Sequence, residues 1–391
     1  MHIENQGIYR QSWAEINIPH LVHNYKTLRA LVDSEAFFCP MLKADAYGHG
    51  AGSVLQALLK EGQRQFGVAL VEEGIELRQA VPANLSKGLE ILAFATFNES
   101  GVQALIQNQL IPVISEWGQL ELMLRGAPPG ARYPIHIKFD TGMHRMGFQP
   151  QDAEKIREHL RRTDQLRLQG VCTHLSDGDD FAQSQGRSQS QIKKFQDLLP
   201  VFASFQPQVH ILNSSALLAH WIGSEGQLSP WGARPGLALY GVWPDGTAGS
   251  DQVSLLPVMS VKSHLVQIHS LEAGERVSYG GRWVAPEPSW VGVVALGYGD
   301  GYPRGLSNRA VMLVRGQEVP VIGSVCMDYT MVDLTGVVTA TGSLAVGEEV
   351  LILGQQGSAG ITAERLASLN QSISYEILTA FGLRMPRVFI F

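Results

Sequence analysis

Short apolar runs alternate with longer amphipathic segments over residues 13–241. Within the longer segments, apolar residues recur at helical spacing, as over residues 21–32, 54–59 and 192–202. This alternation is typical of βα units, so we expect an eight-stranded α/β barrel over residues 11–247. The apolar runs predict its strands at 38–42, 66–70, 91–95, 111–115, 135–139, 168–173, 209–212 and a short stretch ending near Arg234.

The pattern of apolar and polar positions changes after residue 246, where long β-branched stretches are separated by glycine turns. One late helix is predicted over residues 362–369, with Thr362 at its N-cap. Residues 248–391 therefore read as a mainly β C-terminal domain. Its strands are predicted at 258–270, 290–296, 310–314, 319–325 and 349–353.

Composition fits a globular enzyme, since 391 residues with 45% hydrophobic positions provide ample core for two domains. A formal net charge of -6 without clustered lysine and arginine argues against nucleic acid as a partner. Residues 1–11 lack an apolar signal segment, and no apolar stretch is long enough to span a bilayer. We therefore expect a cytoplasmic protein without membrane contact. Cys39, Cys172 and Cys326 are widely spaced, so neither a disulfide framework nor a metal site is expected.

The run from Lys43 to Gly50 places a lysine at the tip of an apolar segment, followed by a glycine-punctuated turn. An ammonium group at a strand tip loses solvation, which lowers its pKa and frees the amine to form a Schiff base. The carbonyl partner would be a substrate or pyridoxal phosphate, with Tyr47 and the turn backbone beside its phosphate. Taken alone, Lys43 has a simpler interpretation as a lysine that extends from a strand end into water.

In a parallel barrel the chemistry gathers at the carboxyl ends of the strands. Polar residues stand at these predicted ends: His174, Ser214, Arg234 and a loop that carries Arg145. Backbone amides at residues 236–237 suit a phosphate, because several N–H dipoles point the same way. Singly, such residues are usually core, surface or turn residues. Their placement at one end of one barrel favours an active site.

Several short motifs follow one another in a fixed order along nearly the whole chain. They are Lys43–Gly50, Lys138–Arg145, Thr173–His174, Asn213–Ser214, Arg234–Gly236, Ser278–Gly280, Gly297–Arg304 and Cys326–Asp328. With these motifs the chain closely resembles the alanine racemases, pyridoxal-phosphate enzymes whose fold is an α/β barrel followed by a β domain.

The resemblance implies that Lys43 carries the cofactor as a Schiff base and then acts as the base on one face of the substrate α-carbon. Tyr279 would act on the opposite face, so that two-base proton transfer interconverts L- and D-alanine. A phenol is a poor base near its usual pKa of about 10 and needs a partner. His174 would be that partner and would link to Arg234, which faces the pyridine nitrogen. A permanently charged guanidinium keeps the ring a weak electron sink and suppresses side reactions such as transamination.

The resemblance also implies the binding groups. Arg145 and the Met327 amide would hold the substrate carboxylate, and a carbamate on Lys138 would orient Arg145. Leu383 stands where well-known members place a tyrosine hydroxyl on the phosphate, so that contact is expected to be missing. The phosphate would be held by Tyr47, Ser214, Gly236 and Leu237, and the supporting residues would be Tyr298, Cys326 and Asp328.

The expected assembly is a head-to-tail homodimer with two shared active sites, in which Tyr279, Tyr298 and Met327 reach the partner's barrel. The D-alanine would serve as a peptidoglycan precursor or enter alanine catabolism. Serine or another small amino acid stays open as the substrate. Three other activities stay open on the barrel alone: a decarboxylase of the same architecture, a non-enzymatic pyridoxal-phosphate carrier and a cofactor-free aldolase. The decarboxylase's glycine-triplet loop and Glu-Pro-Gly-Arg segment are absent from the sequence.

Overall fold

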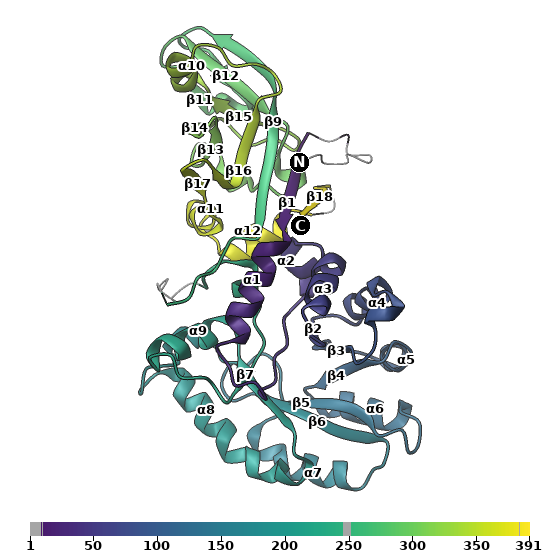
Figure 1. Cartoon of the computed structure of the whole chain (residues 1–391). Coiled ribbons are helices and arrows are strands. Elements are labelled where there is room, and N and C mark those ends of the chain that lie inside the picture. The colour runs from purple at the N-terminus through teal and green to yellow at the C-terminus, as the bar shows by residue number, and fades with distance from the viewer. Residues whose placement is uncertain (1–8, 10, 245–251, 383) are drawn as a thin grey trace. The chain divides into compact units, whose positions relative to one another are not determined.

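The structure is a computed structural model that describes residues 9, 11–244, 252–382 and 384–391 (Figure 1). The chain divides into two compact units. The first unit is Leu21–Leu256, and the second joins the N-terminal segment up to His20 with Pro257–Phe391.

Seven parallel strands of the first unit form one sheet in sequence order. The segment just before Lys43 joins the two edges of this sheet, because Phe38 pairs with Ala233 and Met41 pairs with Gly67, both in parallel. The predicted strand at 38–42 is therefore present as a short connecting segment, and Pro40 within it has no N–H to donate. The seven strands are β2 (Gln65–Val68), β3 (Glu90–Ala93), β4 (Leu110–Ile114), β5 (Tyr133–Lys138), β6 (Leu166–Cys172), β7 (Gln208–Leu212) and β8 (Gly232–Ala233).

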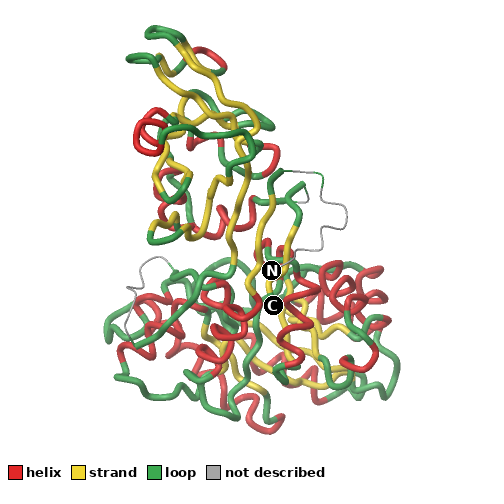
Figure 2. The backbone as a smooth tube through the Cα atoms, turned by 45° about the horizontal axis from the view of Figure 1, so that its top comes forward, coloured by secondary structure: helices red, strands yellow, loops and turns green. Residues whose placement is uncertain are grey.

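Helices cover the outside of these strands (Figures 1 and 2). The apolar stripe predicted over residues 54–59 is the buried face of α3, where Val54, Leu55, Leu58 and Leu59 lie in the core. The helices are α1 (Ile18–Arg29), α3 (Ala51–Lys60), α4 (Val71–Ala80), α5 (Glu99–Gln107), α6 (Trp117–Gly126), α7 (Ala153–Arg161), α8 (Arg187–Leu198) and α9 (Ser214–Gly223). The predicted α/β barrel is confirmed.

The second unit is built on a nine-stranded sheet in the order β17-β16-β13-β14-β15-β12-β9-β1-β18, in which β16 also pairs with β9. Its strands are β1 (Trp13–Asn17), β9 (Met259–Leu271), β12 (Ser289–Val294), β13 (Val311–Val314), β14 (Gln317–Ile322), β15 (Thr330–Asp333), β16 (Glu349–Gln356), β17 (Ala359–Ile361) and β18 (Arg387–Ile390). A small hairpin pairs β10 (Arg276–Val277) with β11 (Trp283–Val284). The predicted mainly β domain is confirmed.

Three helices accompany this sheet: α10 (Thr335–Thr341), α11 (Ala363–Asn370) and α12 (Ser374–Ala380). The predicted cap of α11 is present, since Thr362 Oγ1 accepts the N–H of Arg365 at 3.2 Å. Strand β1 lies between β9 and β18, with Ala14 and Ile16 buried. Its two buried positions give too short a pattern to reveal a strand from sequence. Within the described ranges, no helix combines the length and apolarity that a membrane crossing requires.

Candidate active site

The predicted site residues fall into two groups, one in each unit. The first unit holds the group at the carboxyl ends of the barrel strands: Lys43, Tyr47, Lys138, Arg145, His174, Ser214, Arg234, Gly236 and Leu237. The second unit holds Tyr279, Tyr298, Cys326, Met327 and Asp328. Leu383 lies outside the described residues.

Lys43 is the first residue of α2 (Lys43–Gly48), directly after the segment that joins β8 to β2. Residues 44–47 all have φ between 52° and 54°, so α2 is a left-handed helical turn. Each non-glycine residue in this conformation costs about 1–2 kcal/mol, because Cβ approaches the carbonyl oxygen. Such a turn persists only where the surroundings hold it.

Aromatic packing holds the far side of this turn. The Tyr240 ring stacks on His49 with 4.4 Å between centroids and lies 5.0 Å from the Tyr47 ring. The Tyr240 hydroxyl donates to the Met41 carbonyl at 2.8 Å, two residues before the lysine. These contacts fix the strand end and the turn as one body.

Tyr47 points at a cradle of backbone amides. A Cβ on Gly236 would lie 2.2 Å from Tyr47 Oη, so only glycine permits this approach. Ser214, the first residue of α9, accepts at Oγ the N–H of Gly236 at 2.9 Å and the N–H of Ala238 at 3.3 Å. Leu237 opens the adjoining 3₁₀ turn. A helix N-terminus with converging N–H groups suits a phosphate.

Lys138 ends β5, and Arg145 lies on the loop that follows this strand. Asp140 holds this loop by accepting the N–H groups of Gly142 and His144, both at 3.0 Å. Burial lowers the pKa of Lys138, and Arg145 lowers it further against the opposing effect of Cys172. The half-buried Lys138 ammonium and the exposed Arg145 guanidinium are therefore close enough to repel each other.

Arg234 is 5% exposed and is fixed on two sides of its guanidinium. Nη1 donates to His210 Nδ1 at 2.6 Å and to the His210 carbonyl at 2.7 Å. Nη2 donates to the Thr173 carbonyl at 2.8 Å and approaches His174 Nδ1 at 3.4 Å. Because a guanidinium only donates, both imidazole Nδ1 atoms must be acceptors. His174 then carries its proton on Nε2.

Positive charge and burial dominate this end of the barrel. Burial lowers the pKa of Lys43, Arg145 lowers it further and Glu73 opposes both. Burial also holds the pKa of His174 well below its usual range, with Arg234 as the next cause. The cluster therefore favours a neutral imidazole, a reactive amine and an anionic ligand.

In the second unit the five predicted residues come together on neighbouring loops. Ser324 Oγ donates to the Tyr279 carbonyl at 3.1 Å, and Ser278 Oγ donates to the Ser324 carbonyl at 2.7 Å. Ser278 also lies 3.5 Å from Cys326 Sγ. Ser278 has φ 65° and ψ -177°, a region that is almost reserved for glycine. The residue before the predicted catalytic tyrosine is therefore strained.

The Met327 loop is fastened to the segment that carries Tyr298. The Tyr298 N–H donates to the Cys326 carbonyl at 2.9 Å, and a Cβ on Gly297 would meet that same oxygen at 2.3 Å. Arg384 Nη2 donates to Asp328 at 2.6 Å from the other side. A cavity of about 680 Å³ is lined by Tyr279, Cys326, Met327 and Asp328, among others.

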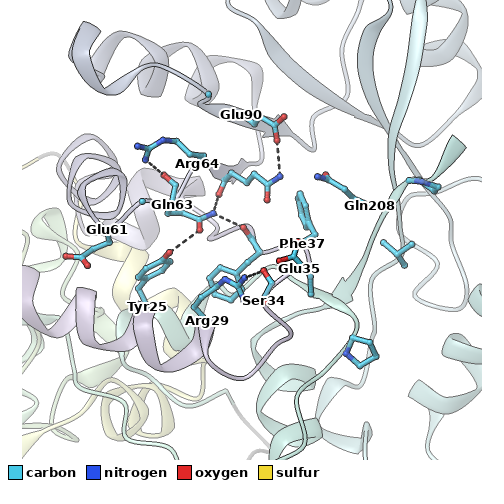
Figure 3. Close-up of a pocket in the computed structure, with 18 of the residues that line it drawn as sticks. Tyr25, Arg29, Ser34, Glu35, Phe37, Glu61, Gln63, Arg64, Glu90 and Gln208 are labelled. Carbon is cyan, nitrogen blue, oxygen red and sulfur yellow. Dashed lines mark hydrogen bonds between the residues drawn. The ribbon is translucent and has the colours of Figure 1, made fainter.

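A cavity of about 760 Å³ lies at the opposite, amino end of the barrel, where Gln65, Glu90 and Gln208 each begin a strand (Figure 3). Its polar groups largely satisfy one another: Tyr25 donates to Gln63 at 3.3 Å, and Glu90 accepts from Gln65 at 3.0 Å. Residues at this end of such barrels support stability rather than catalysis. We therefore place the site at the carboxyl end.

The sequence patterns missed three parts of the site: His136, His210 and Glu73. His136 Nδ1 and His210 Nε2 lie 2.8 Å apart inside the barrel, which extends the Arg234 network. Two histidines within apolar strands were the available signal. Glu73, on α4, contacts the residue after Lys43, and no spacing in the sequence indicates that contact.

Comparison with known proteins agrees with the motifs. The family model for the alanine racemase N-terminal domain matches residues 16–244, and the model for the C-terminal domain matches residues 258–389. An alanine racemase of Thermodesulfovibrio yellowstonii is 37% identical over 383 residues, covering 96% of this chain and 97% of the relative.

Solved structures agree as well. The alanine racemase of E. faecalis is similar with a TM-score of 0.87 and 29% identity, covering 98% of this chain and 99% of that one. The alanine racemase of Bartonella henselae with covalently bound pyridoxal phosphate has a TM-score of 0.83 and 27% identity, covering 97% of this chain and 99% of that one. The family that the motifs predicted is thus confirmed, and the chain belongs to the alanine racemases.

Proposed function

We propose that this protein is a pyridoxal-phosphate-dependent isomerase that interconverts L- and D-alanine, with Lys43 and Tyr279 as its two proton-transferring residues. Family membership over almost the whole chain supports the reaction and the cofactor. The observation that supports the site assignment most strongly is the half-buried Lys43 at the start of a turn whose Tyr47 hydroxyl lies against Gly236, where backbone N–H groups suit a phosphate.

The residues at the carboxyl end of the barrel fit the cofactor. The Lys43 amine would hold pyridoxal phosphate, which would supply an electron sink that acidifies the α-hydrogen of a substrate whose amine has replaced Lys43 on the cofactor. Ser214 and the amides of Gly236 and Leu237 stand where α9 begins and suit the phosphate. Tyr47 adds a hydroxyl beside Gly236. Arg234, held by His210 and Thr173, would face the ring nitrogen of the cofactor with a permanent positive charge.

Lys43 serves as the base on one face of the α-carbon. Burial and Arg145 both lower its pKa, so the neutral amine is more populated near neutral pH than that of an exposed lysine. A neutral amine both attacks a carbonyl carbon and accepts a proton.

Tyr279 serves the other face, with His174 as its partner. Because Arg234 donates to His174 Nδ1, the Nε2–H of that imidazole is free to stabilise a phenolate. A charge-assisted hydrogen bond to the phenolate favours the deprotonated tyrosine. Proton removal on one face and delivery on the other then inverts the α-carbon.

Arg145 and the Met327 amide bind the substrate carboxylate, and Tyr298, Cys326 and Asp328 support the loop that carries Met327. A carbamate on Lys138 would be negatively charged and would therefore bind the positively charged Arg145. Its amine, with a pKa lowered by burial, would attack carbon dioxide, form an N–C bond and release one proton. The carbamate also removes the repulsion between two neighbouring cations.

The working unit in this proposal is a homodimer with two shared sites, in which Tyr279, Tyr298 and Met327 act in the partner's barrel. Large apolar side chains exposed beside the 680 Å³ cavity support an interface there. Tyr279 exposes 74% of its surface, Met327 53% and Tyr329 49%. We place the enzyme in the cytoplasm, where its D-alanine supplies peptidoglycan precursors.

Incubation of the purified protein with L-alanine tests the reaction. Turnover rates for a panel of L- and D-amino acids test the substrate preference. We expect optical rotation to disappear and a cofactor absorbance band that borohydride abolishes. Release of carbon dioxide from the substrate, or faster turnover of serine than of alanine, would overturn the proposed reaction or substrate.

A further inference from the structure

Glu73 joins the carboxyl ends of two neighbouring strands. Its Oε1 accepts the N–H of Ala44 at 2.6 Å, and its Oε2 accepts the N–H groups of Ala69 and Leu70 at 2.8 and 3.0 Å. Ala44 directly follows Lys43, and Ala69 directly follows β2. One carboxylate therefore connects the lysine-bearing segment to the adjacent barrel strand.

We propose that Glu73 is a positioning residue for Lys43, because its carboxylate holds the left-handed turn in the orientation that aims the lysine into the site. The Ala44 N–H belongs to the peptide plane between residues 43 and 44, so a bond to it restricts the backbone from which the Lys43 side chain leaves. The proposal rests on the proposed role of Lys43 as the cofactor-bearing residue.

The site favours a carboxylate in this position for two reasons. Glu73 is the third residue of α4, where the helix dipole stabilises negative charge. Ionised acceptors also form stronger hydrogen bonds than neutral ones, which suits a turn that is disfavoured for residues 44–47. Glu73 also caps the start of α4, because it accepts the N–H groups of Ala69 and Leu70.

The same carboxylate acts on the lysine through space. Burial lowers the pKa of Lys43, and so does Arg145, the cation on the loop after β5. The negative charge of Glu73 raises this pKa. His174 lies within electrostatic reach of the same amine, and the Tyr47 ring centroid is 5.8 Å from Lys43 Nζ. The length of the Glu73 side chain therefore governs its hydrogen bond to the turn, and its charge governs the pKa of Lys43, so substitutions can separate the two effects.

Three variants separate these effects: Glu73→Asp keeps the charge but shortens the reach, Glu73→Gln keeps the length but loses the charge, and Glu72→Gln is the matched control. Glu72 is the exposed neighbour on the same helix. All are compared as unloaded full-length protein after their folding is verified by circular dichroism. Hydrogen exchange of the peptide spanning residues 43–48 reports the turn, and ¹³C-methylation with NMR titration reports the Lys43 amine.

For Glu73→Asp we expect exchange in residues 43–48 to rise about tenfold, as the loss of one charged hydrogen bond allows, with little change in the Lys43 titration. For Glu73→Gln we expect the Lys43 pKa to fall as well. Glu72→Gln should match the wild type in both measurements. If both Glu73 variants behave like Glu72→Gln, the positioning role is wrong.

These readouts need neither cofactor nor alanine. A failure of the proposed racemase reaction would leave them unchanged, and their failure would leave the racemase reaction standing.

Discussion

Arg234 Nη1 and His210 Nδ1 lie 2.6 Å apart within the buried interior of the barrel. Since the guanidinium has no acceptor, His210 must accept at Nδ1 and carry its proton on Nε2. That proton is then donated to His136 Nδ1, 2.8 Å away. One arginine thus sets the tautomers of two histidines behind the site, besides that of His174.

Replacement of His210 by phenylalanine should expose the importance of this network. The new ring can still stack on Phe37, whose centroid lies 4.4 Å from that of His210, but Arg234 Nη1 loses one acceptor. We expect the free energy of unfolding to fall by about 2–3 kcal/mol and cofactor affinity to fall with it. Urea unfolding and a cofactor titration measure both. A variant as stable as the wild type would show that the histidine is a packing residue only.

Acid should destabilise the protein through its buried histidines. Burial lowers the pKa of His136 to about 3, with Arg234 and Arg167 as further causes. Below the unfolded pKa of about 6.5 only the unfolded chain binds this proton, so stability is present above that pH and is lost as pH falls. Between pH 7 and pH 5 His136 should account for about 2 kcal/mol of the loss.

Urea unfolding of the wild type and of His136→Asn at pH 7 and pH 5 tests this. The variant should lose less stability between the two pH values than the wild type does. Equal losses in the two proteins would mean that the folded state also protonates His136.

Gly236→Ala should weaken phosphate binding, because the new Cβ would lie 2.2 Å from Tyr47 Oη and must displace it. Overpacking of this kind costs about 1–3 kcal/mol, which corresponds to a rise of about 5- to 150-fold in the cofactor Kd. Gly336→Ala is the matched control, since a Cβ there meets nothing within 4 Å. Fluorescence titration with pyridoxal phosphate compares the two. Equal affinities of the Gly236→Ala and Gly336→Ala variants would show that Gly236 does not line the phosphate site.

Subunit mixing tests the shared site. Lys43→Ala and Tyr279→Phe chains should each be inactive, whereas a denatured and refolded mixture should regain activity through one intact hybrid site. Full exchange of equal amounts makes half of the dimers hybrids, so activity should approach about one quarter of the wild type. A mixture that exchanges subunits yet stays inactive would show that each chain completes its own site.

The sequence predicted the barrel and the β domain through apolar periodicity, and the order of its motifs predicted the family, because both are signals that local sequence carries. Strand β1 was missed because its pattern has only two buried positions, Ala14 and Ile16. The left-handed turn after Lys43 was not foreseen, since residues 44–47 include no glycine and their conformation depends on tertiary contacts. His210 and Glu73 were missed for the same reason: their partners lie 24 and 29 residues away in the chain.

Exchange of the α-hydrogen of alanine in deuterated water tests the two-base mechanism most directly. For Tyr279→Phe, we expect Lys43 still to exchange the α-hydrogen of one enantiomer with solvent, while inversion falls by at least about 10²-fold, the contribution typical of a general acid or base. The wild type should exchange both enantiomers and invert both. A Tyr279→Phe enzyme that inverts alanine as fast as the wild type would contradict the mechanism.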